Sequence, residues 1–139
     1  MRLIIDSSSI ISALIKNGIS RKIIVSPLIQ FFTPDYSLKE ISKYKELICK
    51  KAKINSNEFD IILNLLFDRI TIISKEEYEE FFVTANTLVD DINDIPFIAL
   101  SLALKADGIW SDDSHFKTRK EITIYRTREL ALAFKPRKR

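Results

Sequence analysis

The chain has 139 residues, 46% hydrophobic and 29% charged, with only two glycines, a composition typical of one folded domain that excludes long flexible linkers. Its net charge is only +3, and no apolar stretch is long enough to span a bilayer. One cysteine and one histidine exclude an internal disulfide and any site built from several of either residue, so a metal here must be held by oxygen ligands.

The first half of the chain alternates apolar β-type runs with helical stripes. The predicted elements, in order, are a strand over 2–5, a helix from the serines at 7–9 to Gly18, a short segment over 20–25, a strand over 31–33, and helices over 37–52 and 56–68. The last of these helices carries its apolar residues at the spacing of one helix face.

The second half continues the alternation. Its predicted elements are a strand over 70–73, a polar helix over 75–88, an apolar helix over 93–106, strands over 108–111 and 122–125, and a helix over 127–134. Strands that alternate with helices indicate a mostly parallel sheet that is covered on both faces. We therefore predict an α/β fold, a three-layer α/β/α sandwich whose sheet has four to five strands.

Four short acidic segments lie where a predicted strand ends or a predicted helix begins. They contain Asp6, Glu40, the pair Asp91 and Asp94, and the adjacent aspartates 112–113. Ligands of such sheets bind at the carboxyl ends of the strands, where the chain turns into the following helices. We therefore expect the four segments to meet at one edge of the sheet.

Each segment also has a purely local explanation. Glu40 lies three residues after Ser37, which is the spacing of a capping box. Asn93 as an N-cap would place Asp94 at the first position of a helix and Pro96 at the third, where both are well tolerated. The last acidic pair could form only a turn and a helix cap.

The local explanations do not account for four carboxylates at one edge. Crowded carboxylates repel each other, and the pKa of at least one rises unless a cation or hydrogen-bond donors compensate. Mg²⁺ and Mn²⁺ are held by carboxylates, water and substrate phosphate oxygens. A site of this kind can hydrolyse phosphodiesters without a histidine or a cysteine, which suits this chain.

Four stretches, taken together and in order, resemble a PIN domain. They are Leu3-Ile4-Ile5-Asp6-Ser7-Ser8-Ser9, the helix start at Glu40-Ile41, Asp94-Ile95-Pro96-Phe97-Ile98-Ala99-Leu100, and Trp110-Ser111-Asp112-Asp113-Ser114-His115-Phe116. Each motif is weak alone, but the ordered set is fairly specific and covers nearly the whole chain. The resemblance implies a Rossmann-like α/β/α sheet.

The resemblance also implies which side chains form the site. The residues that fall on the acidic catalytic and metal-binding positions of the family are Asp6, Glu40, Asp94 and Asp113. Asp91 and Asp112 are neighbours that could support or replace these ligands. One departure is Ser8, where an Asn is common, and it keeps a side chain that can form hydrogen bonds.

Proteins similar to this chain are metal-dependent ribonucleases, so the resemblance implies Mg²⁺ or Mn²⁺ as cofactor and single-stranded RNA as substrate. Asp6, Asp94 and Asp113 would hold one or two ions, and Glu40 would bind metal through water or orient the attacking water. Many family members are toxins of VapBC-type toxin–antitoxin pairs and are often dimeric, which implies an antitoxin partner and a homodimer. Because no secretory signal pattern precedes the first strand, we expect a cytoplasmic protein without a membrane partner.

Basic residues gather toward the C-terminus. Residues 117–139 carry nine Lys or Arg and two Glu, a net charge of +7, whereas the rest of the chain sums to −4. This asymmetry suggests a phosphate-bearing partner. A single domain over 1–134 and a basic tail over 135–139 are predicted. The residues predicted to contact RNA phosphates are Lys117, Arg119 and Lys120, with a solvated turn as the alternative.

Three other functions compete with the nuclease. A catalytically inactive PIN-type scaffold would bind RNA, but such proteins tend to lose acids from the set that this chain retains. A Mg²⁺-dependent phosphatase would want a second Asp at Ser8, and a phosphoacceptor domain would want one in the run 31–33, which has none. Trp110 is predicted to lie in the core, and His115 is given no catalytic role.

Overall fold

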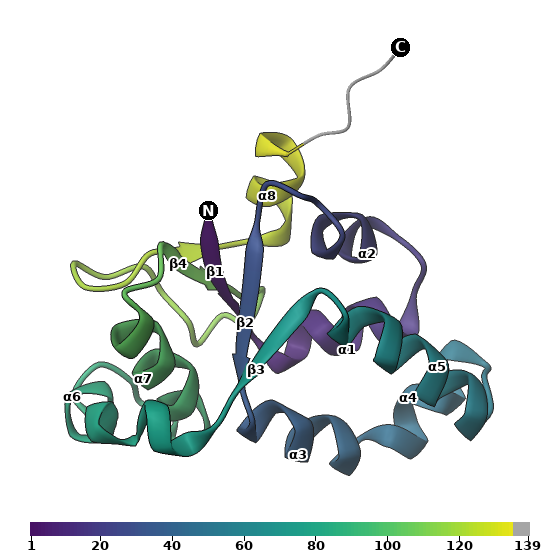
Figure 1. Ribbon diagram of the computed structural model, residues 1–139, viewed down its shortest axis with the longest axis horizontal. Helices are drawn as coiled ribbons and strands as arrows, with labels where there is room; N and C mark the ends of the chain where they lie inside the picture. Colours follow the sequence, from purple (N-terminus) through teal and green to yellow (C-terminus); the bar gives the residue numbers. More distant parts are fainter. Residues whose placement is uncertain (135–139) are drawn as a thin grey trace.

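The computed structural model describes residues 1–134, so the predicted basic tail lies outside the described residues. Its sheet has five strands, and every pair of neighbours is parallel. In the order β3-β2-β1-β4-β5 across the sheet, they are Ile70–Ile73, Gln30–Pro34, Arg2–Ile5, Gly108–Trp110 and Ile124–Tyr125 (Figure 1). The predicted parallel α/β sheet is confirmed.

Helices connect the strands. The α-helices are α1 Ser7–Ile15, α2 Ile19–Ile24, α3 Tyr36–Lys43, α4 Lys45–Ala52, α5 Ser56–Phe67, α6 Phe82–Asn86, α7 Ile95–Leu104 and α8 Thr127–Ala133. Three short 3₁₀ turns are η1 Lys75–Glu77, η2 Glu79–Phe81 and η3 Ile92–Asp94. Within the described residues, none of these helices is long and apolar enough to cross a membrane.

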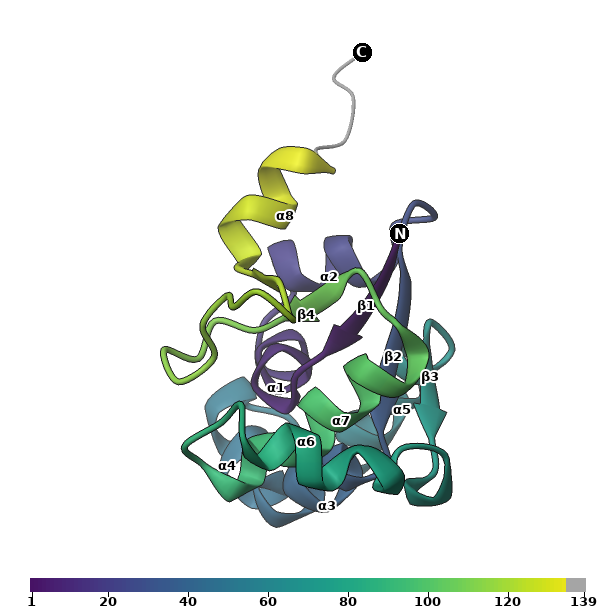
Figure 2. The same ribbon diagram turned by 90° about the vertical axis from the view of Figure 1, so that its left-hand side faces the viewer.

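The sheet separates two hydrophobic cores, because successive side chains of a strand point to opposite faces. Leu3 and Ile5 of β1 face a core formed with α1, α2, α4 and α5. Ile4 faces the other core, which contains the buried residues of α7. Figures 1 and 2 show α6 and α7 on one side of the sheet and α1, α2 and α5 on the other. The predicted three-layer arrangement is confirmed.

Two helix starts differ from the sequence prediction. The N-cap of α1 is Asp6, and the predicted capping serines lie inside the helix. Asp94 is the N-cap of α7, with Pro96 at the second helical position, so the prediction that Asn93 caps this helix is wrong. Pro96 needs no backbone N–H donor at that position, so the shift costs the helix no hydrogen bond. In both cases the N-cap is an aspartate of a predicted acidic segment.

Three predicted elements are shorter or broken. The helix predicted over 37–52 is two helices, because the backbone of Tyr44 leaves the helical region with φ −100° and ψ 9°. The helix predicted over 75–88 consists of η1, η2 and the five residues of α6. The strand predicted over 122–125 is reduced to two residues. Gly18, predicted to end the first helix, instead precedes α2.

Candidate carboxylate site

The register of β1 and β4 places two acidic segments side by side. Ile5 pairs with Trp110, and the Asp6 backbone N–H continues the ladder by donating to the Trp110 carbonyl at 3.1 Å. Asp6 and Ser111 are therefore the first residues beyond two neighbouring strands. This is the edge at which the sequence predicts a ligand site.

A cavity of about 220 Å³ opens at this edge, and we refer to it as the carboxylate pocket. Its lining residues are Asp6, Ser7, Ser8, Ile11, Glu40, Tyr44, Asp91, Asn93, Asp94, Phe97, Asp113 and His115. The four acids predicted for the site, which come from four separate parts of the sequence, thus share one cavity. Asp91, predicted as a supporting acid, lines it as well.

Asp6 is held by two hydroxyl groups. Its Oδ2 accepts hydrogen bonds from Ser8 Oγ and Ser111 Oγ, both at 2.7 Å. Burial raises the pKa of Asp6, and these two hydrogen bonds oppose the rise. Ser8 thus keeps the hydrogen-bonding capacity expected of it. The role of Ser111 was missed, because nothing local in the sequence indicates that its hydroxyl turns toward β1.

Ser111 also links Asp6 to Asp113. Its Oγ accepts the Asp113 backbone N–H at 3.0 Å while it donates to Asp6. Ser111 is fully buried, so its hydroxyl has no competing water. The ends of β1 and β4 therefore share one hydrogen-bond network that sets the spacing of two pocket carboxylates.

Glu40 does not form the predicted capping box. The helix begins at Tyr36 with Asp35 as N-cap, and Glu40 Oε1 accepts a hydrogen bond from Ser7 Oγ at 2.7 Å. Ser37 is buried, and its Oγ has no hydrogen-bond partner within residues 1–134. Burial raises the pKa of Glu40, and the bond from Ser7 opposes the rise. The structure thus directs Glu40 to the pocket and away from its own helix start.

Asp94 is a buried carboxyl group of the pocket without a hydrogen-bond donor among the described residues. It is 8% exposed, and within residues 1–134 no hydrogen-bond donor reaches its side chain. Burial raises its pKa to about 7, with further contributions from the charges of Asp91, Asp6 and Asp113. Within residues 1–134 no Lys, Arg or His forms an ion pair with Asp94.

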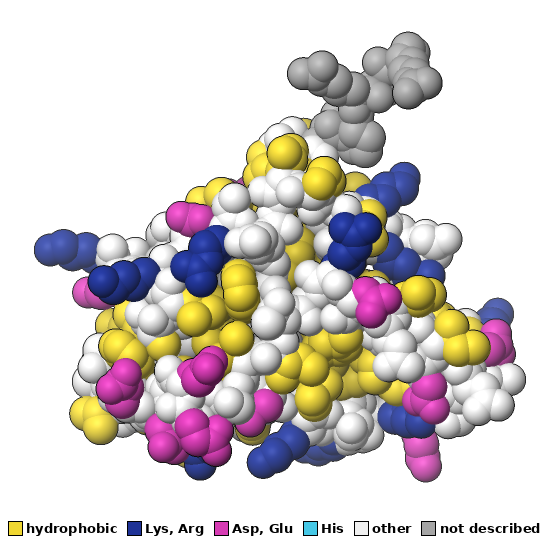
Figure 3. Space-filling model, in the orientation of Figure 1, with side chains coloured by type: hydrophobic (Ala, Val, Ile, Leu, Met, Phe, Trp, Pro, Cys, Tyr) yellow, Lys and Arg dark blue, Asp and Glu magenta, His cyan; other side chains and the backbone are white. Residues whose placement is uncertain are grey.

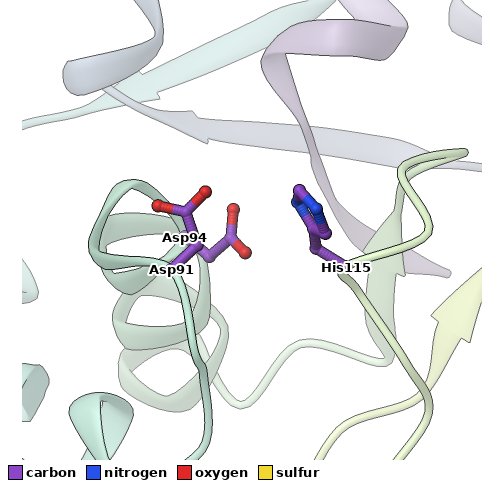
Figure 4. Close-up of side chains that lie close together, drawn as sticks. All are labelled: Asp91, Asp94 and His115. Atoms are coloured by element: carbon purple, nitrogen blue, oxygen red, sulfur yellow. The ribbon is translucent and has the colours of Figure 1, made fainter.

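His115 joins the acids at the mouth of the pocket. Ligand atoms of Asp91, Asp94 and His115 lie within 4.8 Å of one another, and Figure 4 shows the imidazole facing the two carboxylates. His115 Nδ1 is also 3.2 Å from Asp113 Oδ1. The sequence interpretation gave this residue no role and restricted metal ligands to oxygen, whereas the structure adds a nitrogen donor. Its only sequence signal is that it follows Asp113 by two positions.

Asp112 lies outside the carboxylate pocket. Its Oδ1 accepts the Thr127 backbone N–H at 2.8 Å, and its Oδ2 accepts the Thr127 hydroxyl. Thr127 Oγ1 in turn accepts the indole N–H of the buried Trp110 at 2.8 Å. Asp112 therefore ties the start of α8 to the end of β4, and its expected alternative role as a metal ligand has no geometric support.

A second hollow of about 820 Å³ adjoins the pocket, and we refer to it as the outer hollow. Its lining residues are Asp90, Asp91, Ile92, Asp94, Ser114, His115, Lys117 and Arg119. Two of the three predicted phosphate-binding residues line it, whereas Lys120 does not. Figure 3 shows basic side chains over the loop between β4 and β5 and acidic side chains below them, over the segment with α6.

Comparison with protein families gives one informative result. The family model described as PIN domain matches residues 4–134, a span that contains every residue of the pocket and of the outer hollow. No curated protein matches the chain. The resemblance inferred from the ordered acidic segments is confirmed by this match.

Proposed function

The chain belongs to the PIN domain family, whose members are generally nucleases, and on this premise we propose that it is a divalent-cation-dependent endoribonuclease acting on single-stranded RNA. One observation carries the proposal: Asp6, Glu40, Asp94 and Asp113 line a single pocket at the carboxyl ends of the strands. A structural role alone gives no reason to bring these four acids together, because their mutual repulsion destabilises the fold.

The donor set fits a hard divalent cation. Burial raises the pKa values of Asp6, Glu40 and Asp94, and neighbouring carboxylates add to each rise, so a bound cation would stabilise the charged forms of all three. We assign Asp6, Asp94 and Asp113 as the residues that would hold Mg²⁺ or Mn²⁺, with Asp91 beside them. His115 adds an imidazole, a ligand type that Mn²⁺ accepts more readily than Mg²⁺.

The side chains of the pocket have different roles in the proposed hydrolysis. When bound, the cation would activate water and stabilise the charge that develops on the phosphate. Ser8 and Ser111 hold Asp6 in place, and Ser7 holds Glu40 where it can orient the attacking water. Burial raises the pKa of Glu40, which makes this carboxylate a better acceptor for a proton of the attacking water.

RNA would enter through the outer hollow. Lys117 and Arg119 line it together with Asp91 and Asp94. A backbone phosphate bound by these two basic side chains would therefore lie next to the carboxylates. Phosphate contacts of this kind supply affinity without reading sequence. A single strand suits the site better than a duplex, because its backbone can follow an irregular hollow.

Cleavage of a mixed-sequence single-stranded RNA tests the proposal. The purified protein is assayed with Mn²⁺, with Mg²⁺ and with a chelator, beside Asp94→Asn and the matched control Asp90→Asn. Asp90 lines the outer hollow but not the pocket. We expect metal-dependent cutting by the wild type and Asp90→Asn, and none by Asp94→Asn. RNA binding without cutting by all three proteins would favour the inactive RNA-binding scaffold, and release of phosphate from small phosphate esters would favour the phosphatase.

A toxin role rests on the resemblance alone and stays a prediction. If the chain is a toxin, its expression should arrest growth, Asp94→Asn should abolish the arrest, and co-expression of a cognate antitoxin should relieve it. A host that tolerates the active wild-type nuclease would contradict the toxin role without affecting the nuclease proposal.

Self-association is a separate proposal for the outer face of α5. Ile61 and Leu65 lie one turn apart on this helix and are 60% and 61% exposed, whereas Phe59 and Leu66 are buried in the core. The apolar stripe predicted for this helix therefore serves the core, and a second apolar pair faces outward. If the pair mediates a homodimer, Leu65→Lys should convert a dimer to a monomer in light scattering coupled to gel filtration.

A further inference from the structure

We infer that Arg126 is the positioning residue that fixes Asp113 in the carboxylate pocket, an inference that rests on the proposed function of that pocket. Arg126 precedes α8 and follows Asp113 by 13 residues, on the far side of β5 in the chain. Its Nη1 donates to the carbonyl oxygens of Ser111 at 2.8 Å and Asp113 at 2.7 Å. Its Nη2 donates to the carbonyl of Phe116. One guanidinium therefore donates hydrogen bonds to three carbonyl oxygens of one loop.

The loop over residues 111–116 depends on this side chain for its shape. It follows β4 and contains no regular secondary structure, and the sheet ladder reaches only its first residue, where the Ser111 backbone N–H donates to the Tyr125 carbonyl at 3.1 Å. Its other hydrogen bonds are partly internal, such as the one from the Phe116 N–H to the Asp113 carbonyl at 3.1 Å, and partly to side chains and backbone outside it, at Asp6, Tyr125 and Thr127. Arg126 is the side chain that connects the loop carbonyls to a helix.

Arginine is suited to this task, and lysine is not. A guanidinium presents five N–H donors in a rigid planar fork, whereas an ammonium is a point charge on a flexible stem. Among the ion pairs of residues 1–134, none involves Arg126, so its donors are directed at carbonyls. The residue thus serves to order backbone and does not neutralise a pocket acid directly.

The anchor itself is rigid. The Arg126 backbone N–H donates to Glu129 Oε1 at 2.9 Å, which caps the start of α8. Leu130 of the same helix is buried in the core, and Asp112 binds Thr127 from the other side. A fixed helix start therefore holds the guanidinium, and the guanidinium holds the loop.

The effect reaches the pocket through two residues. Ser111, whose carbonyl Arg126 binds, donates its hydroxyl to Asp6. Asp113, whose carbonyl Arg126 also binds, lines the pocket with its carboxylate. Without the guanidinium, the Ser111 hydroxyl and the Asp113 carboxylate are still present, but their positions relative to each other are no longer fixed. The expected consequence is weaker cation binding by a folded protein.

The test compares Arg126→Gln with Arg126→Lys and with Arg128→Gln. Arg128 lies two residues away, is exposed, and loses the same charge when it is replaced. Mn²⁺ affinity is measured by calorimetry, and amide hydrogen exchange is measured in the metal-free protein. We expect Arg126→Gln to weaken Mn²⁺ binding by about 10–100-fold, as for other residues that orient metal ligands. Exchange should rise over 111–116 while β1 stays protected.

Arg126→Lys should resemble Arg126→Gln, because the charge alone does not hold three carbonyls, and Arg128→Gln should resemble the wild type. Cleavage by Arg126→Gln should recover at saturating Mn²⁺, since the ligands themselves are intact. In an Asp113→Asn background, Arg126→Gln should weaken Mn²⁺ binding less than it does in the wild type, because the two residues act through one position.

Unchanged Mn²⁺ affinity and unchanged exchange over 111–116 in Arg126→Gln would overturn the inference. Equal losses of affinity in both backgrounds would overturn its route through Asp113. Failure of the wild type to bind Mn²⁺ would contradict the proposed function instead, and hydrogen exchange would still report whether Arg126 orders the loop. If Arg126→Gln does not fold, Arg126→Lys carries the same comparison with the charge retained.

Discussion

Two walls of the carboxylate pocket bury an aspartate to nearly the same extent but treat it differently. Asp6, at the ends of β1 and β4, is 6% exposed and accepts hydrogen bonds from Ser8 and Ser111. Asp94, at the start of α7, is 8% exposed and accepts none within residues 1–134. Burial raises the pKa of both acids, but only Asp6 has hydroxyl donors that oppose the rise.

One wall of the pocket is therefore preformed, because its aspartate already has hydrogen-bond donors, whereas the aspartate of the other wall has none among the described residues. Hydroxyl donors oppose the rise that burial causes in the pKa of Asp6, whereas burial and neighbouring acids raise the pKa of Asp94 to about 7 with no hydroxyl donor within residues 1–134 to oppose them. A cation would supply at Asp94 what the serines supply at Asp6. Substitutions at the two walls test this contrast.

Replacing Asp6 by Asn should abolish most activity even though its wall is preformed. The serines orient a charged ligand, and an amide in the same place keeps the hydrogen bonds but loses the charge. We expect cleavage to fall by more than about 100-fold, because even residues that only orient metal ligands are worth about 10–100-fold. Initial rates at fixed Mn²⁺ measure this. A rate within tenfold of the wild type would remove Asp6 from the site.

Replacing Asp94 by Asn should stabilise the metal-free protein at high pH. With a folded pKa of about 7, above its unfolded value, Asp94 binds more protons in the folded state between about pH 4 and 7. Its contribution to stability is therefore present at low pH and lost as the pH rises through 7.

We expect Asp94→Asn to be more stable than the wild type by about 2 kcal/mol at pH 8 and to keep only about a third of this advantage at pH 5. Urea unfolding with a chelator at both pH values measures the difference. An advantage of equal size at pH 5 and pH 8 would show that Asp94 does not carry the repulsion.

Replacing Ser111 by Ala should damage the preformed wall. Asp6 would lose one of its two hydroxyl donors, and Asp113 would lose the acceptor of its backbone N–H. We expect cleavage about tenfold lower and unfolding easier by about 1–3 kcal/mol. The matched control is Ser9→Ala, since Ser9 is buried nearby and donates to the Trp110 carbonyl, not to an acid. Equal losses of activity in both variants would contradict a specific role for Ser111.

Replacing Lys117 and Arg119 by Ala should weaken RNA binding on the Asp94 side of the pocket. Each lost phosphate contact should lower the slope of log affinity against log salt by about 0.7 on single-stranded RNA. Lys120→Ala is the matched control, because Lys120 does not line the outer hollow. Fluorescence anisotropy on the inactive Asp94→Asn protein measures binding without cleavage. An unchanged slope in the double variant would place the RNA elsewhere.

Much of the fold follows from local pattern in the sequence. The runs at 2–5 and 70–73 become β1 and β3 with the predicted bounds, because both are rich in the β-branched and apolar residues that favour strands. The helix predicted over 37–52 fails at Tyr44, since a helical stripe gives no sign of where tertiary packing bends the chain. The segment over 75–88 fails for the same reason: its helical pattern carries no record of its packing against α7.

The site is predicted less completely than the fold. Strand ends correctly bring Asp6 and Asp113 to one edge, because that rule depends only on topology. The bonds from Ser7 to Glu40 and from Thr127 to Asp112 join residues far apart in sequence, so no local pattern indicates which acids turn inward. For the same reason, no local pattern indicates the contacts of Arg126 or the position of His115 at the pocket mouth.

Calorimetric titration of Mn²⁺ into the metal-free protein at pH 7, in two buffers of different ionisation enthalpy, tests the central claim that the pocket is completed by a cation. Metal ligands must be deprotonated to bind, and Asp94 has a pKa of about 7. We predict saturable binding with release of about half a proton from Asp94, and weak binding without that release in Asp94→Asn. Absence of Mn²⁺ binding by the folded wild type, or binding that Asp94→Asn leaves unchanged, would contradict the account.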